Sequence, residues 1–372
     1  MKVLEISFNN FRNLENSKIN VSENINVIYG DNAQGKTNLL ECIWLFNGVR
    51  SFRGSKDSEL VSFNTKEKFA TANLKFFFED RIQNVQINIV NGKREAILNG
   101  VKKKSTSHII GKCTSVVFSP EHLNLVKSGP SERRRFLDGA ICRLKMKYAI
   151  EFSKYKKILN QRNALLKEIN INKNLKDTID VWDENLANSG AYLIIERFKY
   201  IELLKKYAID YHSGISKGKE KLDIIYKSSC NINKEDNFKQ IYDKLLINLK
   251  NNLTNDLSFG FTNIGPHRDD LEFLINNVKS KTFASQGQQR SIVLSLKLAE
   301  ASILEEKSDE RPVILLDDVL SELDIYRQDF LLNKIENWQV FITCCDINSI
   351  RNLKSGKIFN VSNGTIIEYE KN

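Results

Sequence analysis

Residues 25–41 constrain the fold of this chain more than any other stretch, because they combine a strand, a glycine-rich turn and a helix start. A short β-branched run precedes Gly30, and residues 38–46 have the pattern of an apolar helix. Between them, residues 30–37 match the phosphate-loop pattern G-x-x-x-x-G-K-[ST] without a substitution. Backbone N–H groups in such a turn point at phosphate oxygens, so the segment predicts a nucleotide site.

The residue types in this loop suit the binding of ATP and Mg²⁺. Gly30 permits the turn, and Gly35 lets the backbone approach the phosphates without a Cβ clash. Lys36 brings a flexible charge to the β- and γ-phosphates, and the Thr37 hydroxyl is placed to ligate Mg²⁺. We expect nucleotide contacts from Gly30, Asp31, Asn32, Ala33, Gln34, Gly35, Lys36, Thr37 and Asn38.

Residues 313–318 supply the second half of a nucleotide site. They form an apolar run that ends in two carboxylates, which resembles a Walker B motif. A buried parallel strand presents such residues at its C-terminal end, where ligands bind. We expect Asp317 to hold Mg²⁺ and Asp318 to polarise the attacking water, so that Lys36, Asp317 and Asp318 form the catalytic set.

A third motif, at residues 285–290, lies directly before a helix expected over residues 291–306. Its sequence, Ser-Gln-Gly-Gln-Gln-Arg, resembles the signature motif of ABC ATPases, and residues 321–324 follow as a D-loop. A serine, a glycine and a helix N-terminus form an anion site, so Ser285, Gly287 and Gln288 are expected to bind a γ-phosphate. In that class the signature faces the phosphate loop of a second protomer, which implies an ATP-bridged homodimer.

The overall pattern predicts an α/β protein of two lobes. An ABC-type P-loop ATPase head, with a mixed sheet and flanking antiparallel strands, is expected over residues 1–125 and 245–372. A short, mostly helical lobe is expected over residues 126–244, with amphipathic helices at 152–169 and 181–211. Residues 259–262 and 271–275 are predicted to be strands.

Basic residues are concentrated in one part of the chain. Residues 100–170 contain sixteen Lys/Arg against five Asp/Glu, a net +11, while the whole chain carries +10. This excess predicts an acidic partner, with DNA as the first candidate and a solvated lysine-rich surface as the alternative. The expected phosphate contacts are Lys102, Lys103, Lys104, Arg133, Arg134, Arg135, Lys154, Lys156 and Lys157.

Composition excludes several other classes of protein. No apolar run approaches the roughly 18 residues of a membrane span, and the first residues read as a strand, so a cytoplasmic location is expected. The six cysteines lack C-x-x-C spacing, which favours buried free thiols over a metal site.

The chain resembles the RecF family of bacterial recombination mediators, among the SMC/Rad50-like ABC ATPases. The resemblance rests on the motifs above and on two stretches peculiar to that family, Gly-Pro-His-Arg-Asp-Asp-Leu at 265–271 and Gln-Arg-Asn-Ala-Leu-Leu-Lys at 161–167. It implies an ATP-gated clamp that binds single-stranded DNA and gap junctions, acts with RecO and RecR, promotes RecA loading and supports SOS induction. It also implies a weak DNA-stimulated ATPase.

Some roles stay open at this stage. Arg12 lies in a turn ahead of the phosphate loop and either reaches the nucleotide or lies on the surface. His267 and Arg268 either contact ATP across a dimer or brace the head. Asp318 and Cys344-Cys345 stand where transporters usually carry a glutamate and a histidine, which suggests slow hydrolysis.

Two other functions compete with a DNA clamp. A transporter ATP-binding subunit is disfavoured by the basic excess and by the roughly 250 residues between phosphate loop and signature. A P-loop small-molecule kinase would have no use for the signature and D-loop. Membrane cofractionation would favour the first rival, and a phosphorylated product the second.

Overall fold

The computed structural model describes residues 1–345 and 356–369. By its contacts the chain divides into two compact units. Unit 1 contains Met1–Asn124, Gly214–Lys217 and Gln286–Asn372, and unit 2 contains Leu125–Ser213 and Gly218–Ser285. In the described ranges no helix is both long and apolar enough to cross a membrane.

Unit 1 contains a mixed sheet with the strand order β15-β14-β3-β13-β12-β8. Its neighbours pair in parallel except for the antiparallel β14–β15 hairpin. The inner strands β12 and β13 are buried along their whole length, as continuous apolar runs predict. The strands are β3 (Ile25–Tyr29), β8 (Ser115–Phe118), β12 (Val313–Asp317), β13 (Val340–Cys344), β14 (Lys357–Ser362) and β15 (Thr365–Tyr369).

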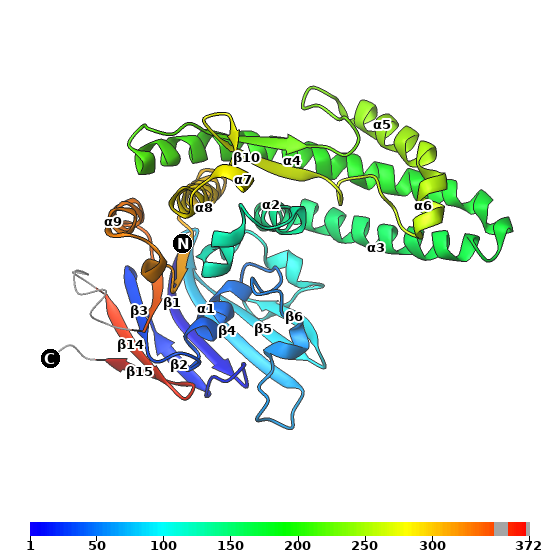
Figure 1. Cartoon of the computed structure of the whole chain (residues 1–372). Coiled ribbons are helices and arrows are strands. Elements are labelled where there is room, and N and C mark those ends of the chain that lie inside the picture. The colour runs from blue at the N-terminus through cyan, green and yellow to red at the C-terminus, as the bar shows by residue number, and fades with distance from the viewer. Residues whose placement is uncertain (346–355, 370–372) are drawn as a thin grey trace. The chain divides into compact units, whose positions relative to one another are not determined.

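A second, antiparallel sheet of unit 1 has the order β2-β1-β4-β5-β6-β7. Its hairpins turn at Asn91-Gly92 and Asn99-Gly100, where all four residues have positive φ, as type I′ turns require. Helix α1 (Lys36–Leu45) lies between the two sheets and is buried around most of its surface (Figure 1). The strands are β1 (Lys2–Asn9), β2 (Ser17–Asn20), β4 (Phe69–Phe78), β5 (Arg81–Val90), β6 (Lys93–Leu98) and β7 (Val101–Lys102).

Two further helices of unit 1 flank β12 in the sequence. Helix α8 (Gln286–Ser308) precedes β12, and α9 (Ile325–Lys334) follows it. Short 3-10 turns are η1 (Asp57–Leu60), η2 (Thr106–Ile109), η3 (Pro120–Asn124) and η5 (Leu320–Glu322).

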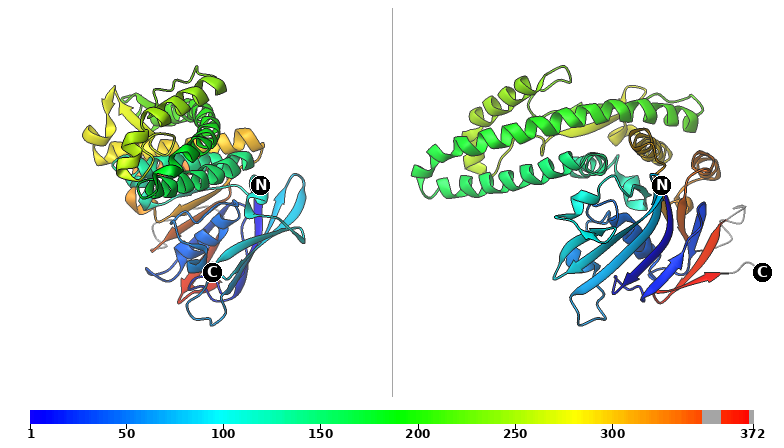
Figure 2. Two further views of the ribbon diagram at one scale, coloured as in Figure 1. Left: turned by 90° about the vertical axis from the view of Figure 1, so that its right-hand side faces the viewer. Right: turned by 180° about the vertical axis from the view of Figure 1, so that it is seen from behind.

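Unit 2 is mainly helical. Its long helices α3 (Met146–Ile169) and α4 (Ile179–Ser216) run side by side in all views (Figures 1 and 2). Buried Arg162 of α3 joins them through an ion pair with Asp183 of α4. The remaining elements are α2 (Pro130–Leu144), η4 (Lys173–Thr178), β9 (Leu222–Lys227), α5 (Phe238–Asn251), α6 (Leu253–Phe259), β10 (Asp270–Ile275), β11 (Val278–Lys279) and α7 (Ser280–Phe283).

Two features differ from the sequence prediction. The strand predicted at 259–262 is wrong, because α6 extends to Phe259 and ends at Gly260, whose φ of 71° suits a glycine C-cap. Unit 2 begins near the expected boundary but extends to Ser285 instead of ending at 244. The reason is that β9 and β10 pair over their whole length, which keeps residues 270–275 with the helical unit.

Candidate nucleotide site

The phosphate loop joins β3 to α1 at the C-terminal edge of the mixed sheet. Gly30 has φ of 155°, and a Cβ there would lie 2.2 Å from the Val361 carbonyl oxygen. Gly35 has φ of 120°, and a Cβ there would lie 2.8 Å from Leu14 Cδ2. Both positions therefore require glycine. Helix α1 begins without a side-chain cap, so the N–H groups of its first turn are available to an anion.

Lys36 is only 4% exposed, and its ammonium group folds back over the loop. Its Nζ donates to the carbonyl oxygens of Gly30 at 2.7 Å and Asp31 at 3.1 Å. It also lies 3.4 Å from Cys345 Sγ, which itself donates to Asn32 Oδ1 at 3.1 Å. The lysine is thus held within the loop by weak, neutral acceptors that a phosphate can replace.

Thr37 and Asp317 meet at the centre of the site. Thr37 Oγ1 donates to Asp317 Oδ1 at 2.8 Å, and Thr343 Oγ1 donates to the same oxygen at 3.0 Å. Burial raises the pKa of the Asp317 carboxyl above its ordinary value, and the hydrogen bonds from Thr37 and Thr343 oppose that rise. The two motifs, separated by 280 positions, therefore form one polar cluster.

This cluster fits a magnesium ion. Two ligands at right angles around Mg²⁺, each at about 2.0–2.1 Å, lie about 2.9 Å apart. The separation of Thr37 Oγ1 and Asp317 Oδ1 is 2.8 Å. Both atoms are hard oxygens, the kind that Mg²⁺ prefers. Asp318 follows with a positive φ of 50°, and its N–H donates to Thr343 Oγ1 at 2.9 Å, which turns the chain sharply after the strand.

Residues 287–291, at the start of α8, bind side chains of the D-loop and of α9 within unit 1. Arg327 of α9 donates from Nε to Ser291 Oγ at 2.9 Å and from Nη2 to the Gly287 carbonyl oxygen at 3.1 Å. Arg290 pairs with Glu322 at 2.8 Å. Ser285 is exposed just before α8, and Gln288 lies half-buried in its first turn. The helix start is therefore braced from the D-loop side.

The side chain of Arg12 contacts α1 and the 3-10 turn η1, and its assignment as a nucleotide contact stays a prediction. Its guanidinium forms a bidentate pair with Glu41, at 2.9 and 3.0 Å, and donates to the Glu59 carbonyl oxygen at 2.8 Å. Glu41 is fully buried, so it requires this cationic partner. The arginine therefore braces α1.

Sequence reasoning missed two residues beside the loop. Arg53 Nη1 donates to Asn38 Oδ1 at 3.0 Å, and its charge lowers the pKa of Asp317 against the larger effect of burial. Asn13 Nδ2 donates to the Ala33 carbonyl oxygen at 3.3 Å, and Asn13 Oδ1 accepts from Asn38 at 2.7 Å. Arg53 lies in a basic turn bounded by glycines at 48 and 54. The turn is recognisable in the sequence, but the sequence does not show that Arg53 contacts the phosphate-loop helix.

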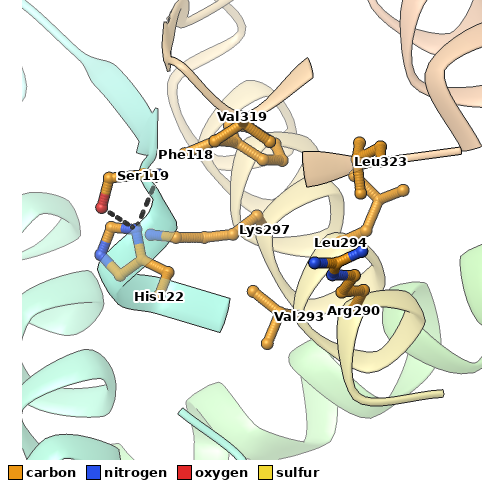
Figure 3. Close-up of a pocket in the computed structure, with 9 residues that line it drawn as sticks. All are labelled: Phe118, Ser119, His122, Arg290, Val293, Leu294, Lys297, Val319 and Leu323. Atoms are coloured by element: carbon orange, nitrogen blue, oxygen red, sulfur yellow. Dashed lines mark hydrogen bonds between the residues drawn. The ribbon is translucent and has the colours of Figure 1, made fainter. Parts of the chain in front are cut away.

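A small pocket lies at the end of β8, beside the Walker B strand. Phe118 pairs with Leu316, so Ser119 follows at the same sheet edge as Asp317. Figure 3 shows His122 bonded to Ser119, with Nδ1 accepting from the Ser119 N–H at 3.2 Å, and Lys297 reaching in from α8. Lys297 is buried and pairs with Glu300 at 2.9 Å.

The cysteines are free, and five of the six are buried. Cys345 is exposed, so the expectation of buried thiols is wrong for this residue. Its position directly after β13 explains the exposure, because the strand ends at the same edge as the phosphate loop.

The predicted DNA contacts fall into three groups. Lys102 pairs with Glu95 on the antiparallel sheet of unit 1, beside Lys103 and Lys104. Lys154, Lys156 and Lys157 are exposed on α3 of unit 2. The three arginines lie on α2.

Arg133 is unsuited to phosphate binding, so that part of the prediction is wrong. It is 4% exposed and forms a bidentate pair with Asp270, at 2.7 and 2.8 Å. Arg134 is half-buried and donates to the Asp269 carbonyl oxygen at 2.8 Å, while Arg135 is exposed and pairs with Glu132 at 3.7 Å.

His267 braces unit 2. Tyr155 Oη donates to its Nδ1 at 2.7 Å, and its Nε2 donates to the Thr262 carbonyl oxygen at 3.0 Å. Burial lowers the pKa of His267 to about 4, so the ring is neutral at physiological pH, as this pattern of one acceptor and one donor requires. The alternative left open for His267 was that it braces the head, and its contacts lie instead within unit 2. A contact with ATP across a dimer stays a prediction.

Comparisons with known proteins agree with the site. The family model described as "RecF/RecN/SMC N terminal domain" matches residues 2–366. Two curated proteins named "DNA replication and repair protein RecF" are 40% identical, one from Lachnoclostridium phytofermentans (98% of this chain, 99% of the relative) and one from Clostridium botulinum strain Alaska E43 (99% and 100%).

Solved structures give the same result. The chain is similar to "Structure of the recombination mediator protein RecF-ATPrS in RecFOR pathway", with a TM-score of 0.92, 40% identity, and 99% and 98% coverage. A second solved structure, "Structure of the recombination mediator protein RecF-ATP in RecFOR pathway", has a TM-score of 0.91, with 40% identity and the same coverage. An Smc head domain from Pyrococcus furiosus, at 16% identity and a TM-score of 0.55, shares the fold and covers 99% and 96%.

Proposed function

We propose that this chain, which belongs to the RecF family of DNA replication and repair proteins, is an ATP-dependent DNA-binding protein of recombinational repair. The observation that carries the proposal is the 2.8 Å contact between Thr37 and Asp317, which joins the phosphate loop and the Walker B strand. The ABC-type fold and the relatives solved with ATP support the same nucleotide.

The residues divide the work of ATP binding. Loop N–H groups and Lys36 would hold the phosphates, Thr37 and Asp317 would hold the metal, and Asp318 would orient the attacking water. Bound Mg²⁺ would neutralise charge that develops on the transferring phosphoryl group. The short Asp318 side chain and the thiols at 344–345 suit slow hydrolysis, which sets the lifetime of a closed state.

ATP closes two copies head to tail, with the signature of Ser285, Gly287 and Gln288 from one protomer against the phosphate loop of the other. The closed dimer binds DNA without sequence specificity, because lysines and arginines contact phosphate. DNA stimulates the weak ATPase, and hydrolysis opens the clamp. Both solved relatives are described as recombination mediators in the RecFOR pathway, which supports RecO and RecR as partners and RecA loading in the cytoplasm as the outcome.

Light scattering tests the proposal. The wild type should be monomeric alone and dimeric with ATP, Mg²⁺ and a gapped duplex, whereas Lys36→Met should stay monomeric. A wild type that dimerises without regard to ATP would refute the clamp. Membrane association would revive the transporter alternative, and a phosphorylated small molecule the kinase alternative.

A further inference from the structure

Unit 2 presents two exposed aromatic rings on either side of a chain reversal. Phe259, the last residue of α6, is 64% exposed, and Phe261 is 39% exposed. Their ring centroids lie 5.7 Å apart with an interplanar angle of 33°. Gly260 between them has φ of 71°, so the left-handed turn at the helix end sets the two rings side by side.

Two cations accompany the rings. The Arg268 guanidinium lies 5.0 Å from the centroid of the Phe261 ring, and its Nη2 donates to the Thr262 carbonyl oxygen at 3.2 Å. The side chain of Lys167 lies over Gly260, where a Cβ would be 3.3 Å from Lys167 Cγ. Both cationic residues are exposed. We call Phe259, Phe261, Arg268 and Lys167 the aromatic platform.

The platform stands on a rigid base. Asn163 Oδ1 accepts from both the N–H and the Oγ1 of Thr262, each at 2.8 Å. Arg162 Nη1 donates to Thr262 Oγ1 at 2.7 Å and to Asp256 of α6 at 2.7 Å. Residues on both sides of the reversal are therefore fixed before any ligand binds, which reduces the entropic cost of binding.

The platform continues the basic surface of α3. Lys156 and Lys167 are eleven residues apart, which is three helical turns and about 16 Å. They therefore lie on the same face of α3. A DNA strand whose phosphates lie along that face of α3 would reach the rings of Phe259 and Phe261.

We propose that the aromatic platform binds single-stranded DNA, with bases stacked on Phe259 and Phe261 and phosphates on Arg268 and Lys167. The proposal deepens the DNA-binding function above and rests on it. Exposed rings beside cations are the chemistry that holds unpaired bases, because each base offers a π-face and each nucleotide a phosphate. Paired bases in a duplex cannot stack in this way. The platform thus gives the protein a preference for the single-stranded side of a gap.

The test compares two probes by fluorescence anisotropy, in the presence of ATP and Mg²⁺. One probe is a labelled oligothymidylate and the other is a blunt duplex of the same length. The double variant Phe259→Ala/Phe261→Ala should bind the single strand at least about 5-fold more weakly, since one stacked base contributes about 5-fold to 150-fold, and its duplex affinity should be unchanged. Phe238→Ala, another exposed ring of unit 2, is the matched control and should bind both probes like the wild type.

The phosphate contact has a separate readout. Lys167→Gln should lower the slope of log affinity against log salt by about one for the single strand. A 5-iodouracil probe, which photocrosslinks to aromatic rings, should label the peptide that contains residues 259–261.

The possible outcomes distinguish this site from the general function. Unchanged single-strand affinity of the double variant, or an equal loss on both probes, would overturn the platform while leaving DNA binding intact. A double variant that keeps both DNA affinities but loses RecR or RecO would assign the rings to a protein partner and also overturn it. A wild type that binds neither probe would refute the proposed function itself.

Discussion

Replacing Arg162 with methionine tests whether the ion network inside unit 2 holds that unit together. The Arg162 side chain is fully buried, as are the side chains of Asp183 and Asp256. Nε donates to Asp183 at 2.6 Å, and Nη1 donates to Asp256 at 2.7 Å. Methionine keeps much of the volume but leaves two carboxylates without their cation.

The expected loss is large. Breaking a buried ion pair from one side costs about 3–5 kcal/mol, because the remaining charge stays buried. Two charge-assisted hydrogen bonds at about 1.5–3 kcal/mol each give a similar total. A domain is stable by only about 5–15 kcal/mol, so Arg162→Met should bring unit 2 close to unfolding.

The loss of unfolding free energy in Arg162→Met should be smaller at low pH. Burial raises the pKa of Asp183, and Arg162 is the main influence that lowers it. Without the arginine, the folded-state pKa of Asp183 rises further above the unfolded value of about 3.9. Protonation then favours the folded state, so the stabilisation is present at low pH and is lost as the pH rises through the folded pKa. The stability deficit of the variant should therefore shrink as the pH falls from neutrality through the raised pKa of Asp183.

Urea unfolding followed by circular dichroism measures the total effect, and hydrogen exchange of peptides from α3, α4 and α6 assigns it to unit 2. Adding Asp183→Asn and Asp256→Asn should restore more than half of the lost stability, because both orphaned charges disappear. Lys157→Met, an exposed change on the same helix, is the control. A loss below about 1 kcal/mol, or a deficit that grows on acidification, would refute the reasoning.

Three further predictions concern the nucleotide site. Asp317→Asn should reduce ATP hydrolysis by at least about 100-fold in a phosphate-release assay, with ATP binding in EDTA retained, because the metal loses its anionic ligand. Mg²⁺-dependent nucleotide binding should weaken as the pH falls through the raised pKa of Asp317, while binding in EDTA changes less, as calorimetry at several pH values will show. N-ethylmaleimide should block ATP binding by modifying exposed Cys345 beside Lys36, and bound ATP should protect the thiol from labelling in mass spectrometry.

These three predictions have their own controls. Asp329→Asn, a change on α9 outside the cluster, should leave hydrolysis unaltered. A pH profile that is the same with and without Mg²⁺ would argue against protonation of Asp317. Cys345→Ser should bind ATP and resist the reagent; if it is inhibited equally, another thiol is responsible.

The nucleotide site was largely predictable because its information is local. A strand, a turn and a helix start are adjacent in the sequence around Gly30, and the Walker B strand carries its own apolar run before Asp317. The buried parallel strands and the I′ hairpins follow from equally short patterns. Such elements form with the same geometry in many contexts, so their sequence suffices to place them.

The errors and the missed contacts arise where a distant partner decides the outcome. The sequence around Arg12 does not indicate that it pairs with Glu41, and the sequence around Arg133 does not indicate that it pairs with Asp270. Each ion pair reduces the exposure of the arginine to solvent. The boundary expected at 245 fails because β10 takes a partner strand that lies more than forty residues earlier. Residues 259–262 have strand-like composition, but the left-handed Gly260 ends a helix there instead.

The placement of β3 has a consequence for protein synthesis. Both neighbours of this strand, β13 and β14, come from the far end of the chain, and Ile25 pairs with Val340. At about 5–20 residues per second, a ribosome needs roughly 15–60 s after finishing β3 to supply its partners. The antiparallel sheet can pair during that interval from hairpins already made. The strand that leads into the phosphate loop, however, gains its partners only after residues 340–362 are made, so we expect a chain that stops before residue 340 to lack the sheet that positions this loop.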